Sequence, residues 1–142
     1  MTTYSRTWNG YEFELEVTVG TGKRRSVVAK AVGVAQLSTG VVPLLHAEGL
    51  ISECPSGDTC MKLMTIRAEP KYANFGPFIL RTLVAIARAH GCKTVWGEAS
   101  SQDTPWAALR TFYRREGFCI NPRTRMFRKE ISATANNWHD CI

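Results

Sequence analysis

Hydrophobic and polar residues alternate along the first part of the chain. From Tyr11 to Val19 every second side chain is apolar, and glutamates or a threonine stand between them. A period of two predicts a β-strand with one buried face. After the turn residues Gly20 to Lys23, the Val- and Ala-rich stretch Ser26 to Leu37 is predicted as a second strand paired to the first, with a helix as the alternative. Residues 1–10 are polar and expected to be loosely held.

The pattern is less decisive in the middle of the chain. Residues 41–53 fit either a short strand or the start of a helix. Cys54 to Asp58 contains Pro, Ser, Gly and Asp, which is typical of a turn. Met61 to Ala68 reads as a strand, and Pro70 ends it.

The hydrophobic period changes in the second half. One helical stripe predicts a helix over 77–90, in which Pro77 suits the first position and Gly91 the stop. A strand follows over 93–98, then a second helix over 105–116 that Gly117 ends, and strands from 118–120 and over 126–131. The expected order of elements is several strands, followed by strand–helix–strand–helix–strand–strand. This order predicts a mixed sheet flanked by two helices.

Length and composition narrow the class. The 142 residues fit one domain over 1–142, with a polar tail from about residue 132, and 44% hydrophobic with 21% charged residues is ordinary for a globular protein. No apolar run approaches the roughly 20 residues that span a bilayer, and the N-terminus lacks a signal-peptide core. We therefore expect a cytoplasmic protein with no membrane partner.

Cysteine and charge add two expectations. The five cysteines include no CxxC and no His pair stands at metal spacing, so we expect no metal site and reduced thiols, with a Cys54–Cys60 bridge left open. The net charge of +6 attracts anions, and is compatible with an acidic protein partner. No helix-turn-helix, zinc-finger or RNP signature is present, which argues against nucleic acid.

Three segments of the chain are notable for their residues and for the order in which they occur. Leu63-Met64-Thr65-Ile66-Arg67-Ala68-Glu69-Pro70 is followed by Lys71-Tyr72-Ala73-Asn74-Phe75-Gly76-Pro77-Phe78-Ile79-Leu80, and later by Ala107-Ala108-Leu109-Arg110-Thr111-Phe112-Tyr113-Arg114-Arg115-Glu116-Gly117-Phe118. The last is similar to an A-x-x-x-Y-x-x-x-G-F stretch. From Lys62 to Ile131, about half of the chain, the sequence resembles the GCN5-related N-acetyltransferase (GNAT) family.

The resemblance implies an α/β fold of the α+β type with a mixed, mostly antiparallel sheet. The N-terminal half is reduced, because only Gly20 to Arg25 separates two strands where the family usually has two helices. The implied function is acyl-CoA-dependent N-acyl transfer from acetyl-CoA to an amine of a small molecule or a protein. The oligomeric state stays open, a homodimer included. The alternative is a catalytically inactive GNAT-like module that binds a protein or nucleic acid.

The family pattern also implies cofactor-binding residues. In the family, the fourth strand ends in a bulge whose unpaired backbone binds pantetheine, which places Ile66, Arg67 and Ala68 there. Backbone N–H groups at the next helix start hold the pyrophosphate. One alignment puts Lys71, Asn74 and Gly76 on the family's Q/R-x-x-G-x-G/A loop, with Phe75 inside it; another puts Pro70-Lys71-Tyr72 on P-x-Y and shortens the loop by two residues. Arg110 is a candidate for the 3′-phosphate.

Catalytic roles follow from the same resemblance. Tyr113 matches the tyrosine that protonates the departing thiolate, and a phenol, which titrates near 10, can donate a proton there. The oxyanion donor would be a backbone N–H near Ile66 or Arg67. The predicted fourth strand contains no acidic residue between Cys60 and Ala68. The candidates for the general base are therefore Glu69 and Glu98 at two strand ends, while His46 is interpreted as structural.

Overall fold

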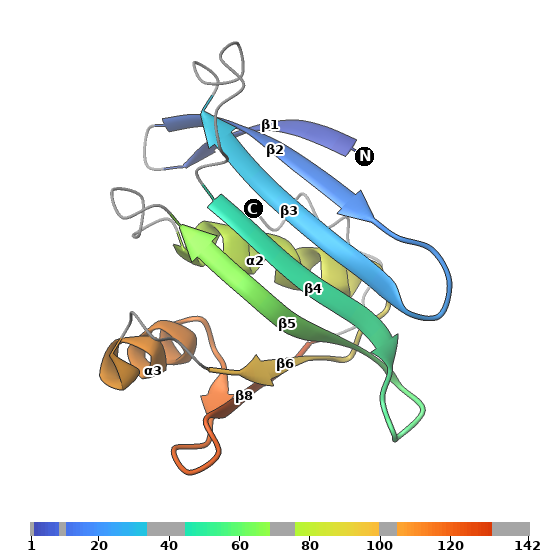
Figure 1. Ribbon diagram of the computed structural model, residues 1–142, viewed down its shortest axis with the longest axis vertical. Helices are drawn as coiled ribbons and strands as arrows, with labels where there is room; N and C mark the ends of the chain where they lie inside the picture. Colours follow the sequence, from blue (N-terminus) through green and yellow to red (C-terminus); the bar gives the residue numbers. More distant parts are fainter. Residues whose placement is uncertain (1, 9–10, 34–44, 69–75, 100–104, 132–142) are drawn as a thin grey trace.

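The computed structural model describes residues 2–8, 11–33, 45–68, 76–99 and 105–131. Within these ranges the chain forms one eight-stranded sheet and two helices, with the strand order β1-β2-β3-β4-β5-β6-β8-β7. All neighbours in the sheet are antiparallel except β5 and β6, which are parallel. The predicted α+β class with a mixed, mostly antiparallel sheet is therefore confirmed (Figure 1).

The N-terminal half consists of strands. These are β1 (Thr2–Trp8), β2 (Tyr11–Val19) and β3 (Arg25–Gly33). The alternation over 11–19 correctly predicted β2, whose residues Leu15 and Val17 are buried. The expectation that residues 1–10 are loosely held is wrong for Thr2–Trp8, because all seven residues of β1 pair with β2. The polar sequence of β1 suits an edge strand, which has one neighbour and little buried surface.

A second hairpin resolves the ambiguous middle of the chain. β4 (Leu45–Glu53) is a strand, and its alternate residues Leu45, Ala47, Gly49 and Ile51 are buried. It pairs with β5 (Thr59–Ala68) across the predicted turn. Cys54 and Cys60 form a disulfide at this turn, with 6.0 Å between their Cα atoms. The expectation of reduced thiols is wrong for this pair, since the hairpin brings the two residues to disulfide distance.

The C-terminal half follows the predicted order. It contains α2 (Gly76–Ala89), β6 (Thr94–Glu98), α3 (Trp106–Arg115), β7 (Cys119–Ile120) and β8 (Met126–Glu130). Helix α2 crosses from β5 to the parallel β6, and β7 and β8 form a terminal hairpin. Neither described helix is long and apolar enough to cross a membrane.

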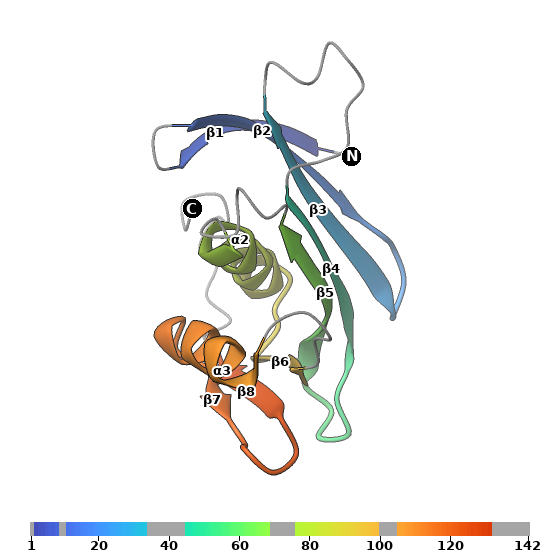
Figure 2. The same cartoon turned by 60° about the vertical axis from the view of Figure 1, so that its left-hand side comes forward.

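Both helices lie on one side of the sheet (Figure 2). The apolar stripe of α2 packs on β3, β4 and β5, and Phe78, Leu80 and Leu83 are fully buried there. The other face of the sheet, which is turned toward the viewer in Figure 1, carries no helix among the described residues. We call this the open face. GNAT-family proteins usually have two helices after the first strand. Residues 25–33 and 45–53 do not supply these helices, because both stretches are strands.

Candidate active site

Strands β5 and β6 separate after a short paired stretch. Their pairing covers only Cys60–Lys62 with Thr94–Trp96, although β5 continues to Ala68 and β6 to Glu98. The register between β4 and β5 also shifts, because Glu48 faces Thr65 whereas Gly49 faces Leu63, which leaves Met64 as an extra residue. This β-bulge lies where the two strands begin to diverge (Figure 1). A bulge leaves backbone groups outside the ladder and can direct them toward a ligand.

Gly97 closes the narrow end of this divergence. A Cβ atom at Gly97 would lie 3.0 Å from the carbonyl oxygen of Leu63 and 2.5 Å from Cζ of Phe127. Both are closer than side chains normally approach, so only glycine fits at this position of β6, between the backbone of β5 and the ring of Phe127. The pairing of the two strands therefore ends at a tightly packed point, beyond which the edge of β5 from Leu63 to Ala68 has no strand partner among the described residues.

Tyr113 lies in an aromatic cluster beneath β6 and β8. Its ring stacks on Phe127 with centroids 4.0 Å apart, and it contacts Phe112 and Phe118 edge to face at 5.0 and 5.7 Å. The side chain is 8% exposed. Burial raises the pKa of Tyr113 to about 12, because the phenolate would lose its hydration. Since Phe127 also contacts the site of Gly97, one aromatic ring separates Tyr113 from the start of the strand divergence.

Helix α2 begins beside α3. Gly76 is buried, and a Cβ atom there would lie 3.2 Å from Cε1 of Phe112. Arg110 lies two residues before Phe112 on α3, and its Nε is buried with no hydrogen-bond partner in the described part of the chain. A buried guanidinium nitrogen without an acceptor fits an anion that the chain itself does not supply. The predicted loop residues Glu69, Lys71, Asn74 and Phe75 lie outside the described residues.

The remaining predicted residues divide between the two faces. Ile66 packs against the core on the helix side, and Ala68 pairs with Leu45. Arg67 is exposed and faces His46 of β4. Glu98 is exposed, and its neighbours Gly97 and Ala99 are buried on the helix side, so Glu98 belongs to the open face. Glu98 and Tyr113 are therefore on opposite sides of the sheet.

The structure places His46, which the sequence indicated as structural, next to Glu48. His46 Nε2 lies 3.0 Å from Glu48 Oε1, and both side chains are on the open face, 28% and 46% exposed. Glu48 sits opposite Thr65, beside the bulge. Side chains at positions i and i+2 lie on the same face in a strand but not in a helix. The closeness of His46 and Glu48 could therefore be recognised only after residues 45–53 had been assigned to a strand.

No group of three or more His, Cys, Asp or Glu side chains is arranged to hold a metal within the described ranges. The reactive groups available are thus a buried phenol, an imidazole–carboxylate pair, a further carboxylate and exposed strand backbone.

Solved structures share this fold. A cAMP-binding acyltransferase from Mycobacterium smegmatis aligns with a TM-score of 0.65 at 12% identity, over 92% of this chain and 47% of its own. The NatC complex bound to Gag peptide and CoA gives 0.60 at 10% identity, over 74% and 71%. An acetyltransferase of the GNAT family from Staphylococcus aureus gives 0.54 at 11%, over 74% and 67%. No family model matches the sequence, and no curated protein matches it.

The chain has the fold of the GCN5-related N-acetyltransferases, which confirms the family resemblance at the level of structure. At identities of 10–12% the comparison shows the fold alone. The donor, the acceptor and the role of each residue depend on this chain's own side chains.

Proposed function

We propose that this protein is an acyl-CoA-dependent N-acyltransferase that uses acetyl-CoA and modifies an amine of a small molecule or a protein. The observation that carries the proposal is the divergence of β5 and β6 at the Met64 bulge, with Tyr113 beneath it and carboxylates above it. Acetyl-CoA supplies the activated acyl group as a thioester.

The donor fits residues on the helix side. On the edge that faces away from β4, β5 from Leu63 to Ala68 has no strand partner among the described residues. Its backbone there offers N–H and C=O groups to an amide-rich arm, as a neighbouring strand would. The N-terminus of α2 at Gly76 carries partial positive charge, which suits a pyrophosphate. The unpartnered Nε of Arg110 supports a further phosphate contact on α3.

Tyr113 acts as a neutral hydrogen-bond donor to the leaving sulfur. Its pKa of about 12 keeps the phenol protonated at neutral pH. A free thiol titrates near 8.5, so complete proton transfer from this phenol to a thiolate is uphill unless the same burial also raises the basicity of the sulfur. A hydrogen bond that strengthens as charge develops on sulfur needs no complete transfer.

The amine loses its proton on the open face. Glu98 is one base candidate, and the His46–Glu48 pair is a second, because it lies one strand away from the bulge and joins an imidazole to a carboxylate at 3.0 Å. In such a pair the carboxylate orients the ring and stabilises the imidazolium that forms. Glu69 remains a third candidate outside the described residues.

Thiol release from acetyl-CoA tests the proposal directly. We would supply spermidine or a peptide library with free α- and ε-amines, and identify acetylated products by mass spectrometry. Amine-dependent release with a matching mass gain of one acetyl group is expected. Glu98→Gln and Glu48→Gln, measured separately, should then differ by at least tenfold in turnover, which assigns the base. Release that is independent of every amine would contradict N-acyl transfer.

One observation favours the noncatalytic alternative. Phe112 packs against Gly76 at the very start of α2, where an anion would need access to backbone N–H groups. If the ring blocks that position, the fold would serve as a binding module without a donor. Phe112→Ala separates the two cases, because it should enhance acetyl-CoA binding only if the ring obstructs the site.

A further inference from the structure

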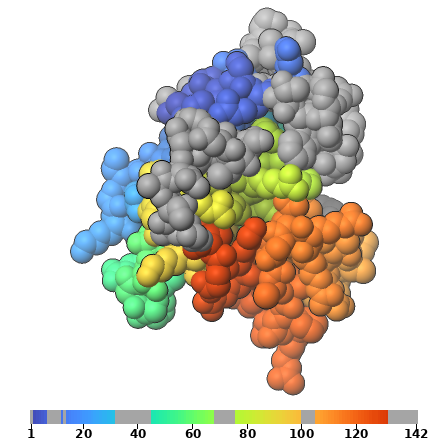
Figure 3. All heavy atoms as spheres, turned by 180° about the vertical axis from the view of Figure 1, so that it is seen from behind, coloured from blue at the N-terminus to red at the C-terminus, as the bar shows by residue number. Residues whose placement is uncertain are grey.

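A pocket lies between the outer side of α2 and the C-terminal end of α3. Its volume is about 390 Å³. Figure 3 views the molecule from this side, with α2 in yellow-green next to the orange and red segment that contains α3 and β8. Apolar side chains of Leu80, Val84 and Phe118 form part of its lining. A hollow of this size on a chain of 142 residues can hold a small organic ligand.

The rest of the lining is strongly basic. Arg81 and Arg88 reach it from α2, Arg115 from the end of α3 and Lys129 from β8, and Glu116 is the one acidic residue among them. The pKa of Lys129 is lowered by burial and by the charges of Arg88 and Arg81, while Glu116 acts in the opposite direction. The cations are thus near enough to repel one another, and an anion between them would relieve that repulsion.

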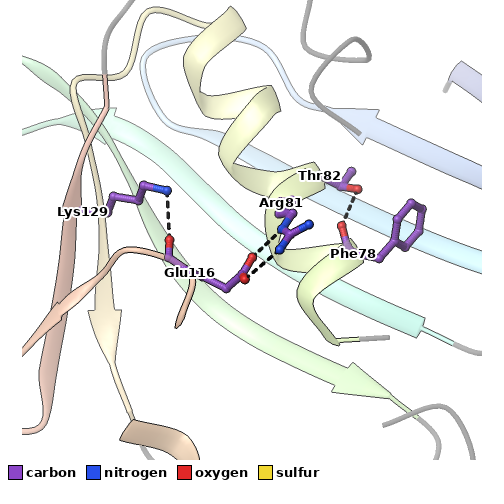
Figure 4. A network of polar contacts seen from close by, with 5 residues as sticks. All are labelled: Phe78, Arg81, Thr82, Glu116 and Lys129. Atoms are coloured by element: carbon purple, nitrogen blue, oxygen red, sulfur yellow. Dashed lines mark hydrogen bonds and ion pairs between the residues drawn. The ribbon is translucent and has the colours of Figure 1, made fainter. Parts of the chain in front are cut away.

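Internal contacts fix the walls of the pocket (Figure 4). Arg81 donates two hydrogen bonds to the carboxylate of Glu116, at 2.6 and 3.0 Å. The Lys129 ammonium donates to the backbone carbonyl of Glu116 at 2.9 Å, and it lies over the ring of Phe118. An ammonium has three N–H donors, so this carbonyl uses one of them. Glu116 balances the charge of Arg81, and Arg115 and Lys129 add further positive charge to the same lining.

The far end of the pocket, at Arg88 and Lys129, is separated from the donor site proposed above, whereas its near end at Leu80 lies about one helical turn from Gly76. Lys129 pairs with Val95, and Val95 pairs with Met61, in the stretch where β5 and β6 are still hydrogen-bonded. The donor residues lie beyond that stretch, toward Gly76. From Gly76 to Arg88 the axis of α2 extends about 18 Å, at 1.5 Å per residue. A donor bound along the free edge of β5 would therefore run away from the pocket.

We propose that this pocket is a second ligand site, which binds a phosphate monoester attached to a small apolar group. A phosphate dianion matches the excess of cationic side chains, and guanidinium groups suit its geometry. The apolar walls would contact the attached group. The proposal does not depend on acyl transfer, so it stands or falls separately from the proposed function.

Two probes present this chemistry from different sources. Phenyl phosphate represents a small metabolite, and a short phosphoserine peptide represents a modified protein. Titration of the ¹⁵N-labelled protein with each, at constant ionic strength, should shift the amide signals of Gly117 and Lys129 to saturation with at least one probe. Arg115→Gln and Lys129→Met should each weaken the apparent Kd at least tenfold. Arg115→Gln is the safer variant, because Arg115 is exposed whereas Lys129 supports Glu116.

A matched control lies next in the chain. Arg128 precedes Lys129 on β8 but points to the open face, so Arg128→Gln removes the same charge outside the pocket. It should leave the Kd within about twofold. Equal weakening by Arg128→Gln and Arg115→Gln would overturn the proposal, as would a titration that never saturates. Displacement of phenyl phosphate by 3′-dephospho-coenzyme A, which has no phosphate monoester, would also overturn the claim of a separate site.

Discussion

Tyr113 matches the tyrosine of the family pattern and is also part of the packed core. Its ring stacks on Phe127, and no hydrogen bond of its hydroxyl occurs within the described residues. Tyr113→Phe therefore keeps the stacked ring and removes only the donor. We expect turnover of acetyl-CoA with an amine to fall about 100-fold, with the thermal midpoint changed by no more than a few degrees. Steady-state kinetics and circular dichroism measure both. Unchanged turnover would remove Tyr113 from the mechanism.

Tyr113 should also affect the free energy of unfolding at alkaline pH. Its pKa rises from 10.0 in an exposed phenol to about 12 in the folded chain. The unfolded chain thus loses this proton first, and the free energy of unfolding falls as pH rises from 10 to 12. The contribution of Tyr113 to that fall is about 2–3 kcal/mol, at about 1.4 kcal/mol for each pKa unit.

Urea denaturation at both pH values measures this term as the difference between wild type and Tyr113→Phe. Other groups, such as the Cys92 thiol, whose pKa burial raises to about 11, titrate in both proteins and cancel in the comparison. Parallel losses of stability in the two proteins would mean that Tyr113 is not buried as described.

At the residue scale, the sequence offered a candidate where a single side chain carried the signal. Tyr113 could be selected because Gly117 and Phe118 follow at the family's spacing. The His46–Glu48 pair could not, because its significance comes from the strand that aligns the two side chains and from the bulge on β5 beside it. The unpartnered Nε of Arg110 depends on tertiary burial, which no local pattern contains.

At the scale of elements, the β4–β5 hairpin carries the disulfide. Cys54 and Cys60 close a short loop, six positions apart. By the loop-entropy relation such a bridge stabilises the fold by about 2 kcal/mol. We expect the free energy of unfolding to fall by that amount when dithiothreitol is added. The variant Cys54→Ser/Cys60→Ser should show no response to the reductant. A response of equal size in that variant would place the redox-sensitive group elsewhere.

The contact between α2 and α3 depends on Arg81 and Glu116. The Glu116 side chain is 8% exposed and that of Arg81 is 51% exposed, and they share two hydrogen bonds. Exposure of the arginine weakens the pair by solvent screening, so a double-mutant cycle with Arg81→Ala and Glu116→Ala should give a coupling energy of about 1 kcal/mol. Chemical denaturation of the four proteins measures it. Additive effects of the two changes would show that the ion pair does not hold the helices together.

Local periodicity predicted most elements, and tertiary pairing decided the rest. The nine-residue alternation of β2 and the apolar stripe of α2 were sufficient by themselves. β1 was missed because its sequence is polar and its order comes from pairing with β2. β4 was ambiguous because Ala47 and Gly49 give a weak apolar signal on its buried face. The short pairing of β5 with β6 depends on Gly97 and Phe127, which are distant in sequence from β5.

At the scale of the whole molecule, the sheet separates two environments. The helices lie on one side (Figure 2), together with the aromatic cluster around Tyr113. The open face carries His46, Glu48 and Glu98. At the bulge and the divergence of β5 from β6, the strands are no longer paired, so the sheet does not separate its two sides there. A donor bound from the helix side could meet an acceptor on the open face there, without either crossing the core.

Binding of acetyl-CoA tests this arrangement most directly, and thermal unfolding with and without it is the measurement to make. At 100 times its Kd the ligand should stabilise the fold by about 2.7 kcal/mol, a shift of several degrees. Gly76→Glu, which places a carboxylate at the start of α2, should abolish the shift, and Arg110→Gln should weaken the Kd about tenfold. Arg128→Gln on the open face should leave it intact. No shift at millimolar acetyl-CoA, or a full shift in Gly76→Glu, would contradict a donor site at the diverging strands.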